Sequence, residues 1–307
     1  DAGDQLLGGT GDDLYFIRTG NEIIVEAANA GDDTVQVGFT YSLAGVDHVE
    51  NLTLTGTGDF DATGNGLDNT LTGNAGSNVL DGGAGDDTAS YINSASAVTA
   101  SLDEGTATVS GVEDTLVSIE NLTGSLSADR LTGDEGDNEL QGMSGDDVLL
   151  GGEGHDTLVG GLGQDQLAGG EDQDVFLIRP QDSRTGAFDS ILDFGPGDIL
   201  QLEGIAGIAL YPTIYGPVED LATALQAMVS DPTINDQAVF FRVSDEADLY
   251  LSINGAGTGE SFEGTLVRFN GLDAMPSISQ LPGLLVANHR PVVADELADQ
   301  SATEDTE

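Results

Sequence analysis

The stretch Gly151-Gly152-Glu153-Gly154-His155-Asp156-Thr157-Leu158-Val159 decides the fold of this chain, because variants of it follow one another at a strict interval of nine residues. An acidic or amide residue keeps the sixth place of each unit, and a large apolar residue comes two places later. The sixth-place residues are Asp129, Asn138, Asp147, Asp156, Asp165 and Asp174. The apolar residues are Leu131, Leu140, Leu149, Leu158, Leu167 and Phe176. This register predicts a stack of turns and short strands.

The same register returns in two shorter blocks nearer the N-terminus, over residues 1–16 and 64–90. A degenerate unit, Gly31-Asp32-Asp33-Thr34-Val35, lies between them. The sixth-place residues of the two shorter blocks are Asp13, Asn69, Asn78 and Asp87. The stack is therefore expected to contain three groups of regular repeats.

The segments around these blocks are rich in β-branched and apolar residues, which favour strands. We expect short strands there at residues 15–18, 22–26, 34–39 and 49–55. Val49-Glu50-Asn51-Leu52-Thr53 recurs as Ile119-Glu120-Asn121-Leu122-Thr123, each time shortly before a block of repeats. The recurrence indicates that a longer unit was duplicated, an irregular strand segment followed by nonapeptides.

Beyond residue 178 the composition changes, and we expect strands at 238–243, 249–254 and 265–270. Residues 218–230 are the good helix candidate, because their apolar side chains fall on one helical face. An open end of a stacked β structure exposes unpaired backbone and apolar surface, so terminal units must differ from the rest. We therefore interpret this region as a β-rich cap with one short helix.

The sequence thus divides into several segments. They are degenerate N-terminal repeats and strands (1–63), a first repeat block (64–90), a strand insertion (91–123), the main block (124–178), the capping β region (179–283), and a linker with the first strand of a following module (284–307).

The charge balance is extreme, with 55 acidic residues against 7 basic ones and a net charge of −48. Nucleic acids and anionic membrane surfaces need a cationic patch, so neither is expected as a partner. Blocks of acid are often only solvated or disordered. Here the acids keep a fixed place beside glycine, which favours a ligand pattern. The chain also has no cysteine and no apolar run long enough to span a bilayer, so we expect no membrane insertion.

The residue types of the repeat fit one class of metal ion. Glycines at the first, second and fourth places allow positive φ and let successive turns stack closely. The sixth-place carboxylate and the carbonyls freed by the turn supply hard oxygen donors, which suit calcium rather than zinc or copper. A thin apolar spine with this much like charge needs cations to hold it together. We therefore predict several Ca²⁺ ions and a roll that is disordered without calcium and folded with it.

The nonapeptide resembles the repeat of the RTX (repeats-in-toxin) family over residues 1–16, 64–90 and 124–200. The resemblance implies an all-β fold, a parallel β-roll that is a right-handed β-helix. It also implies that two repeats form one coil, with each ion between turns eighteen residues apart. Carried onto this chain, the ligand pairs are Asp129 with Asp147, Asp147 with Asp165, Asn138 with Asp156, Asp156 with Asp174, and Asn69 with Asp87. Asparagine is a neutral ligand, so sites that use Asn69, Asn78 or Asn138 are expected to be weaker.

Two further segments carry resemblances of their own. Asp189, Asp193 and Asp198 lie around a turn and resemble the segment that closes the roll in secreted RTX proteases, so we expect at least one of them to bind calcium. Turn-forming or exposed acids are the alternative. Residues 288–300 resemble the opening strand of a cadherin-like or immunoglobulin-like module of a large bacterial surface protein. An acidic disordered tail is the alternative there.

The family resemblance implies type I secretion from a Gram-negative bacterium and folding on extracellular calcium. We therefore expect a secreted or cell-surface protein, in which this chain is a calcium-binding structural segment of a large adhesin. The alternative is a non-catalytic C-terminal domain of a secreted protease or polysaccharide-modifying enzyme. The chain has no H-E-x-x-H or G-x-S-x-G motif, so no catalytic residue is expected. Surface glycans or other cell-surface ligands of the parent protein stay open as partners.

Overall fold

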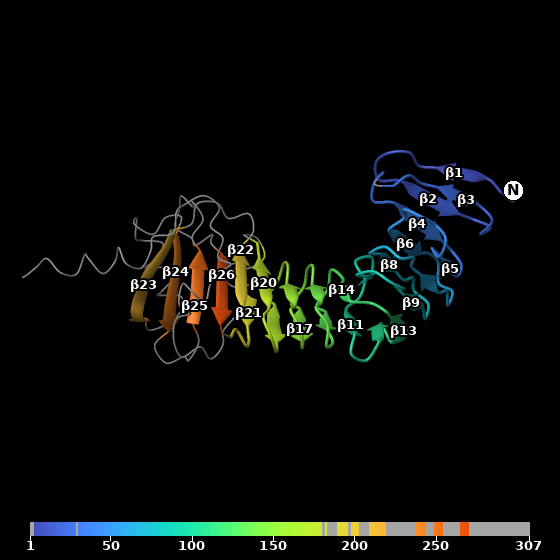
Figure 1. Cartoon of the computed structure of the whole chain (residues 1–307). Coiled ribbons are helices and arrows are strands. Elements are labelled where there is room, and N and C mark those ends of the chain that lie inside the picture. The colour runs from blue at the N-terminus through green and yellow to red at the C-terminus, as the bar shows by residue number, and fades with distance from the viewer. Residues whose placement is uncertain are drawn as a thin grey trace, which may run out of the picture.

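The computed structural model describes residues 3–28, 30–179, 182, 189–195 and 198–202, and beyond them the backbone of four strands. These four strands are β23 (Ala209–Val218), β24 (Gln237–Val243), β25 (Leu249–Ile253) and β26 (Thr265–Phe269). The described residues form strands and turns and contain no helix, so the predicted all-β fold is confirmed. Figure 1 shows an elongated stack of short strands with a bend part-way along.

Most strands belong to two long sheets that share one apolar interior. The first sheet contains, in spatial order, β2 (Leu14–Ile17), β4 (Thr34–Val37), β6 (Asn51–Leu54), β8 (Thr70–Thr72), β10 (Thr88–Ser90), β14 (Asn121–Thr123), β16 (Glu139–Gln141), β18 (Thr157–Val159), β20 (Val175–Ile178) and β22 (Ile199–Leu202). The second sheet contains β5 (Tyr41–Ser42), β7 (Ala62–Thr63), β9 (Val79–Asp81), β13 (Val112–Val117), β12 (Thr106–Val109), β11 (Val98–Ser101), β15 (Arg130–Thr132), β17 (Val148–Gly152), β19 (Gln166–Gly170) and β21 (Asp189–Ile191), followed by β26, β25, β24 and β23. A separate pair consists of β1 (Gln5–Leu7) and β3 (Ile23–Val25).

In the main block, strands that follow one another in the chain alternate between the two sheets, so one coil consists of two nonapeptides. In the first sheet Leu140 lies beside Leu158, and in the second sheet Leu131 lies beside Leu149. All the pairings of the main block are parallel, and equivalent residues of neighbouring coils are 18 residues apart. The predicted parallel roll with two repeats per coil is confirmed.

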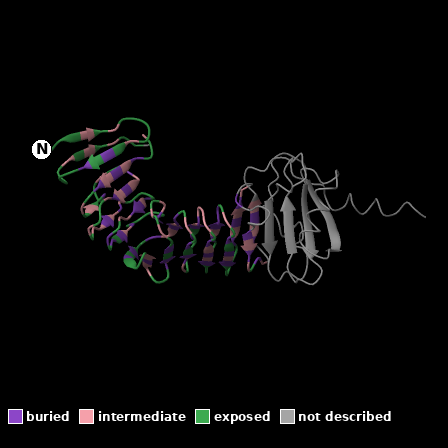
Figure 2. Cartoon of the chain, turned by 180° about the vertical axis from the view of Figure 1, so that it is seen from behind, coloured by how far each residue is buried: buried purple, intermediate pink, exposed green. Residues whose placement is uncertain are grey.

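The interior is a double column of apolar side chains, one column from each sheet. The apolar residues of the main block are all 0% exposed, namely Leu131, Leu140, Leu149, Leu158, Leu167 and Phe176. Their strand neighbours, such as Thr157 and Gln166, are partly or fully exposed, and Figure 2 shows this alternation along the roll. A strand with one face against a core requires this period of two.

The strand insertion explains the bend in the stack. β11, β12 and β13 form an antiparallel meander in the second sheet, where β13 pairs with β9 and β11 with β15. In the first sheet β10 pairs directly with β14. The meander therefore adds strands to one face only, and that face becomes longer than the other. Figure 1 shows the stack changing direction at this level.

The duplicated motif found in the sequence forms equivalent strands. Asn51 and Asn121 begin β6 and β14, and each of these strands lies in the first sheet just before a regular repeat block. Leu52 and Leu122 continue the apolar column at 0% and 1% exposure. The strands expected at 15–18, 22–26, 34–39 and 49–55 correspond to β2, β3, β4 and β6; β2 begins and ends one residue earlier than expected, and the other three are shorter.

At the C-terminal end, β21 and β22 continue the two sheets of the roll. Beyond them β26 pairs parallel with β21, and β24, β25 and β26 pair antiparallel, as a terminal unit unlike the coils. The strands expected at 238–243, 249–254 and 265–270 are confirmed as β24, β25 and β26. Apart from Val218, which ends β23, the predicted helix lies outside the described residues, as does the tail of residues 284–307. The division into segments stays a prediction.

Candidate metal centre

A polar side chain immediately precedes each strand of the first sheet. Because the strands are parallel and in register, these side chains form one row, which we call the first ladder. Its members are Asp13, Asp33, Glu50, Asn69, Asp87, Glu120, Asn138, Asp156, Asp174 and Asp198. The equivalent row on the second sheet, the second ladder, contains Asn78, Asp114, Asp129, Asp147, Asp165 and Asp189. Every predicted site residue except Asp193 lies on one of the two ladders.

The ladder aspartates that follow Asp13 use one carboxylate oxygen to hold the coil before them. The backbone N–H of Asp129 donates to Oδ1 of Asp147 at 2.7 Å, and that of Asp147 donates to Oδ1 of Asp165 at 2.9 Å. On the first ladder, the N–H of Asp156 donates to Oδ1 of Asp174 at 3.0 Å. The same bond joins Asn69 to Asp87, Asn138 to Asp156, Asp165 to Asp189 and Asp174 to Asp198.

The other carboxylate oxygen of most ladder aspartates is buried without a hydrogen-bond partner. Oδ2 is in this state in Asp13, Asp33, Asp87, Asp147, Asp156, Asp165 and Asp174. As whole side chains, Asp87, Asp147, Asp156 and Asp174 are 0% exposed. An ionised carboxylate with a buried, unpaired oxygen is strongly unfavourable, so this oxygen requires a proton or a cation.

Glycine at the first place of the repeat brings backbone carbonyls to these oxygens. A Cβ atom added to Gly142 would overlap Oδ2 of Asp147 and the carbonyl oxygen of Gly160 in the next coil. Gly151 is placed in the same way against Asp156. The space that a side chain would fill is therefore lined by carboxylate and carbonyl oxygens. These are hard donors of the kind that calcium prefers, so the residues present fit a calcium ion.

Burial changes the acidity of the ladder carboxylates. It raises the pKa of Asp147 and of Asp156 to about 7, against the hydrogen bond from the preceding coil, and neighbouring carboxylates raise it further. The same causes raise the pKa of Asp174 to about 6. A low-dielectric surrounding disfavours the charged form unless an opposite charge is present. The cation-free ladders therefore hold protons more tightly than exposed aspartates do.

Asparagine on the ladders closes its coil without a cation. The amide Nδ2 of Asn69 donates to the carbonyl of Glu50 at 3.1 Å, and Nδ2 of Asn138 donates to that of Glu120 at 2.8 Å. Asn78 donates in the same way to Phe60 at 2.7 Å. In each case Oδ1 accepts a backbone N–H four residues earlier, from Asn65, Asn74 or Asp134. Both polar atoms of each amide therefore have partners within the fold, and none requires a cation.

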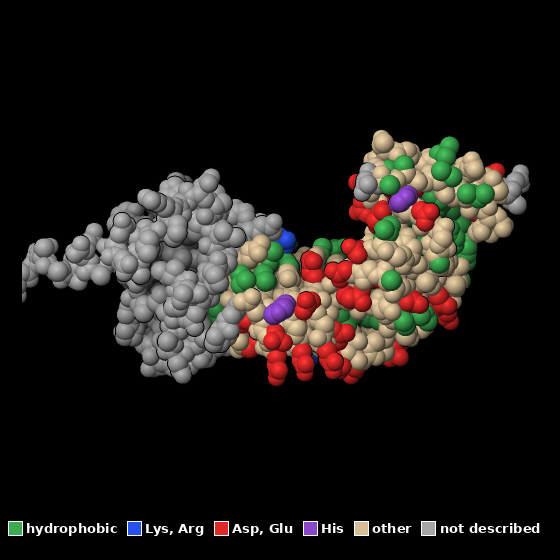
Figure 3. Space-filling view, viewed as in Figure 1, with side chains coloured by type: hydrophobic (Ala, Val, Ile, Leu, Met, Phe, Trp, Pro, Cys, Tyr) green, Lys and Arg blue, Asp and Glu red, His purple; other side chains and the backbone are tan. Residues whose placement is uncertain are grey.

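Aspartates at the fifth place of the repeat form a separate, exposed row. Oδ1 of Asp137 accepts the N–H of His155 at 2.8 Å, and Oδ1 of Asp146 accepts the N–H of Gln164 at 3.0 Å. Figure 3 shows acidic side chains following one another along the outside of the roll. These acids hold neighbouring turns together while staying in contact with water. They provide a natural control for the buried ladders.

Four ladder residues were not predicted from the nine-residue periodicity. Glu50 and Glu120 accept the N–H of Asp33 and Asp87 at 2.9 and 2.8 Å. Oδ1 of Asp114 accepts the N–H of Asn78 at 2.8 Å, while its Oδ2 accepts the Tyr91 hydroxyl. The missed residues are Asp33, Glu50, Asp114 and Glu120. Each has an apolar residue two places later, and this local signal could have found them.

The three acids expected to close the roll have different positions. Asp189 accepts the N–H of Asp165 at 3.2 Å and Asp198 that of Asp174 at 3.1 Å, so both continue the ladders across steps of 24 residues. Asp193 is exposed and accepts the N–H groups of Gly169 and Gly170, each at 3.0 Å. The structure therefore places Asp193 as a turn cap beside the ladders.

The stacked coils, the glycine turns and the two carboxylate ladders define a parallel β-roll of the calcium-binding class. In agreement with this geometry, the sequence matches the family described as RTX calcium-binding nonapeptide repeat, in four copies, over residues 63–90, 123–158 and 141–176. These parts of the roll therefore consist of RTX repeats, and RTX nonapeptide repeats bind calcium ions.

The chain is also similar to parts of known proteins. It is 41% identical over 66 residues to the endo-1,3-1,4-beta-glycanase ExsH of Rhizobium meliloti, and 38% identical over 66 residues to the endo-1,3-1,4-beta-glycanase EglC of the same organism. Each match covers 22% of this chain and 14% of the glycanase. A solution structure of the AlgE6R3 subunit of the Azotobacter vinelandii mannuronan C5-epimerase is 24% identical, with a TM-score of 0.37, and the match covers 55% of this chain and 83% of that one.

In the part of the chain that the structure describes, no helix is long and apolar enough to cross a membrane.

Proposed function

We propose that this chain is a calcium-dependent structural segment of a larger secreted or cell-surface protein, folded by ions held between its coils. The observation that carries the proposal is the row of buried, unpaired Oδ2 atoms facing glycine carbonyls. Ions joining Asp147 with Asp165 and Asp156 with Asp174 are the strongest candidates, because in each pair both Oδ2 atoms lack a partner. A divalent ion there would supply the positive charge that the buried carboxylates require.

The other predicted pairs form a graded series. Asp129 accepts hydrogen bonds from the backbone and hydroxyl of Ser125, so its carboxylate depends less on a cation. The pairs of Asn138 with Asp156 and Asn69 with Asp87 combine one unpaired carboxylate with one satisfied amide, and we expect them to bind calcium more weakly. Of the closing acids, we propose Asp189 and Asp198 as ligands that extend the ladders.

Circular dichroism of the full chain during a calcium titration tests the proposal. At neutral pH the calcium-free chain is expected to show much less β structure, because the aspartate coils unfold, and millimolar calcium is expected to restore the spectrum of a β-rich protein. Magnesium at equal ionic strength is the control, because its smaller ion demands near-octahedral geometry and dehydrates reluctantly. A spectrum already β-rich in chelator and unchanged by millimolar calcium would rule the proposal out.

Two kinds of parent protein fit such a segment. One is a large surface adhesin, in which the roll would be a spacer or support between binding modules. The other is an enzyme that acts on polysaccharides, in which the roll would be a non-catalytic accessory domain. The similarity to two endo-1,3-1,4-beta-glycanases favours the second parent. In both, the chain itself carries no catalytic residue, and any glycan contact belongs to the parent.

The polypeptide on either side of residues 1–307 separates these parents. Tandem β-sandwich modules there would support the adhesin, whereas a catalytic domain would support the enzyme. Export is a common requirement of both, and we propose type I secretion from a Gram-negative bacterium as the route. Detection of the parent protein in the culture medium or on intact cells, and its absence when the secretion channel is deleted, would test the route.

A further inference from the structure

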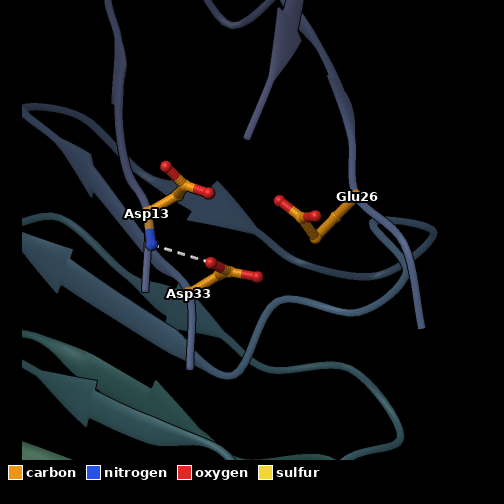
Figure 4. A group of neighbouring side chains, drawn as sticks. All are labelled: Asp13, Glu26 and Asp33. Atoms are coloured by element: carbon orange, nitrogen blue, oxygen red, sulfur yellow. Dashed lines mark hydrogen bonds between the residues drawn. The ribbon is translucent and has the colours of Figure 1, made fainter. Parts of the chain in front are cut away.

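Three carboxylates meet at the N-terminal end of the roll, away from the regular blocks. Asp13, Glu26 and Asp33 each offer an oxygen within 4.8 Å of the oxygens of the other two. Figure 4 shows the carboxylate of Glu26 facing those of Asp13 and Asp33. Asp13 and Asp33 belong to the first ladder, but Glu26 comes from the connection between β3 and β4. The cluster therefore contains a residue that the nonapeptide register does not provide.

The cluster contains buried oxygens that have no partner. Asp33 is 1% exposed, and its Oδ1 accepts the N–H of Asp13 at 2.8 Å. Its Oδ2 is buried without a hydrogen-bond partner, and so is Oδ2 of Asp13. Burial raises the pKa of Asp33, and the charges of Glu26 and Glu50 raise it further, against the hydrogen bond from Asp13. Two unpaired, buried oxygens therefore face the carboxylate of Glu26, which is partly exposed.

The backbone and a tyrosine shape the space between the carboxylates. A Cβ atom added to Gly8 would overlap the Tyr15 hydroxyl, Oε2 of Glu26 and Oδ2 of Asp13. The Tyr15 hydroxyl donates to Oε2 of Glu26, and the N–H of Ala27 donates to Oε1 at 2.9 Å. Glu26 is thus held in place by two donors. Neither of these donors bonds to Oδ2 of Asp13 or Oδ2 of Asp33, so these two oxygens have no hydrogen-bond partner.

We propose that Asp13, Glu26 and Asp33 bind one divalent cation, with calcium as the ion best suited to their oxygens. The site differs from those of the main roll because three carboxylates converge, and because one of them lies outside the repeat. It does not require the main roll to bind calcium. The ion would join the connection after β3 to the starts of β2 and β4, and so attach the separate β1–β3 pair to the first sheet. A two-stranded sheet is marginally stable alone, and this link would stabilise it.

Terbium provides a direct test, because it occupies calcium sites and emits when a nearby tyrosine is excited. The chain has no tryptophan, and Tyr15 donates directly to Glu26. We expect the full chain to give a tyrosine-sensitised emission that calcium displaces and that Tyr15→Phe removes. Tyr91→Phe is the matched control, since the Tyr91 hydroxyl donates to the ladder residue Asp114. Emission from the N-terminal site should survive in that control.

Glu26→Gln tests the ligand itself. It is expected to weaken terbium binding at the Tyr15-dependent site by about tenfold or more, because the number of charged ligands sets the affinity of such sites. Glu22→Gln is the control from the same segment, because Glu22 accepts from Thr19 and is not part of the cluster. Glu26→Asp keeps the charge and should restore part of the binding. This rescue separates loss of a ligand from loss of local folding.

The inference is overturned if no emission depends on Tyr15, or if Glu26→Gln and Glu22→Gln bind terbium with the same midpoint. The outcome is independent of the proposed function. A Tyr15-dependent site in a chain whose circular dichroism ignores calcium would retain this site and remove the calcium-folded roll. A roll that folds on calcium but gives no Tyr15-dependent emission would support the proposed function and exclude the three-carboxylate site.

Discussion

The coils around Asn69 and Asn78 and the coils around Asp147 and Asp156 share one backbone register but satisfy their turns in opposite ways. In the first region the ladder side chains donate amide N–H groups to carbonyls of the preceding coil. In the second region Oδ2 takes the place of the amide oxygen beside the first-place glycine, and it has no partner. Asparagine and aspartate have almost the same shape. The comparison teaches that a coil closes by itself where a second-place N–H donates to the ladder oxygen beside the first-place glycine, and needs a cation where no donor reaches that oxygen.

The residue at the second place of the repeat also differs between the two kinds of coil. In the amide-closed coils it is occupied by Asn65 and Asn74, whose Nδ2 groups donate to backbone carbonyls such as those of Val49 and Gly58. In the aspartate coils it is occupied by glycines such as Gly152, with φ of 132°. A paired N…N pattern thus marks turns filled by side chains, and a G…D pattern marks turns that leave room for an ion.

The largest expected effect is selective unfolding on calcium removal. In excess chelator at neutral pH, residues 142–174 should lose their amide protection, because buried carboxylates are left unpaired. Residues 64–81 should keep most of theirs, because their turns are closed by amides. Hydrogen–deuterium exchange of the full chain, with and without calcium, measures both regions at once. Equal loss of protection in the two regions would contradict the proposed difference between aspartate coils and amide-closed coils.

Replacement of one ladder aspartate by asparagine tests the difference between the two kinds of coil at a single position. Asp156→Asn removes a charged ligand but supplies an amide donor like that of Asn138. We expect the calcium midpoint of folding to rise by about tenfold, while the calcium-free chain becomes more stable. Calcium titrations followed by circular dichroism give the midpoint, and thermal unfolding in chelator gives the stability. Asp137→Asn, at the exposed fifth place, is the control and should change neither quantity appreciably.

A pH dependence of opposite sign is expected with and without calcium. In the cation-free roll the pKa of Asp147 and Asp156 is about 7, above the ordinary value of 3.8, so the folded state binds more protons than the unfolded state between these values. The stability of the cation-free roll should therefore fall as the pH rises from about 4 to 7. In saturating calcium, protons compete with the ion, and stability should rise over the same window. Thermal unfolding at several pH values in chelator and in calcium checks both signs; parallel curves would contradict the assignment.

The smallest expected effect concerns Met143, which holds the second place of its repeat with a φ of 76°. Gly161 holds the equivalent place with a φ of 94°. A side chain is strained in this left-handed region, so Met143→Gly should stabilise the calcium-bound roll by about 0.5–1 kcal/mol. Met143→Ala keeps a Cβ atom and should give no such gain. Chemical denaturation in saturating calcium measures the difference, and a gain in both variants would point to another cause.

The regular part of the fold could be predicted from the sequence because its information is local. The register puts Asp156 at the turn before β18, and the two-repeat coil that the family resemblance implies places Leu140 beside Leu158. It also identifies glycine as the residue that fits beside a ladder carboxylate. These features repeat every nine residues, so each unit supports the interpretation of the next.

The irregular parts could not be predicted in this way, because strand pairing there is not local. The meander of β11, β12 and β13 separates Asp87 from Glu120 on the first ladder, and the step from Asp165 to Asp189 is 24 residues long. No fixed period contains these steps. Glu120 also reaches its partner with a side chain one methylene longer than aspartate, so residue type gave no signal either.

The hydrogen bonds that the ladder aspartates accept from the preceding coil all have the same direction along the chain. Asp147 completes the coil of Asp129, Asp165 completes that of Asp147, and Asp189 completes that of Asp165. Each of these aspartate coils is thus completed by an acceptor that is C-terminal to it. The irregular final coil therefore does more than end the roll, because its Asp189 and Asp198 supply the acceptors for the coils of Asp165 and Asp174.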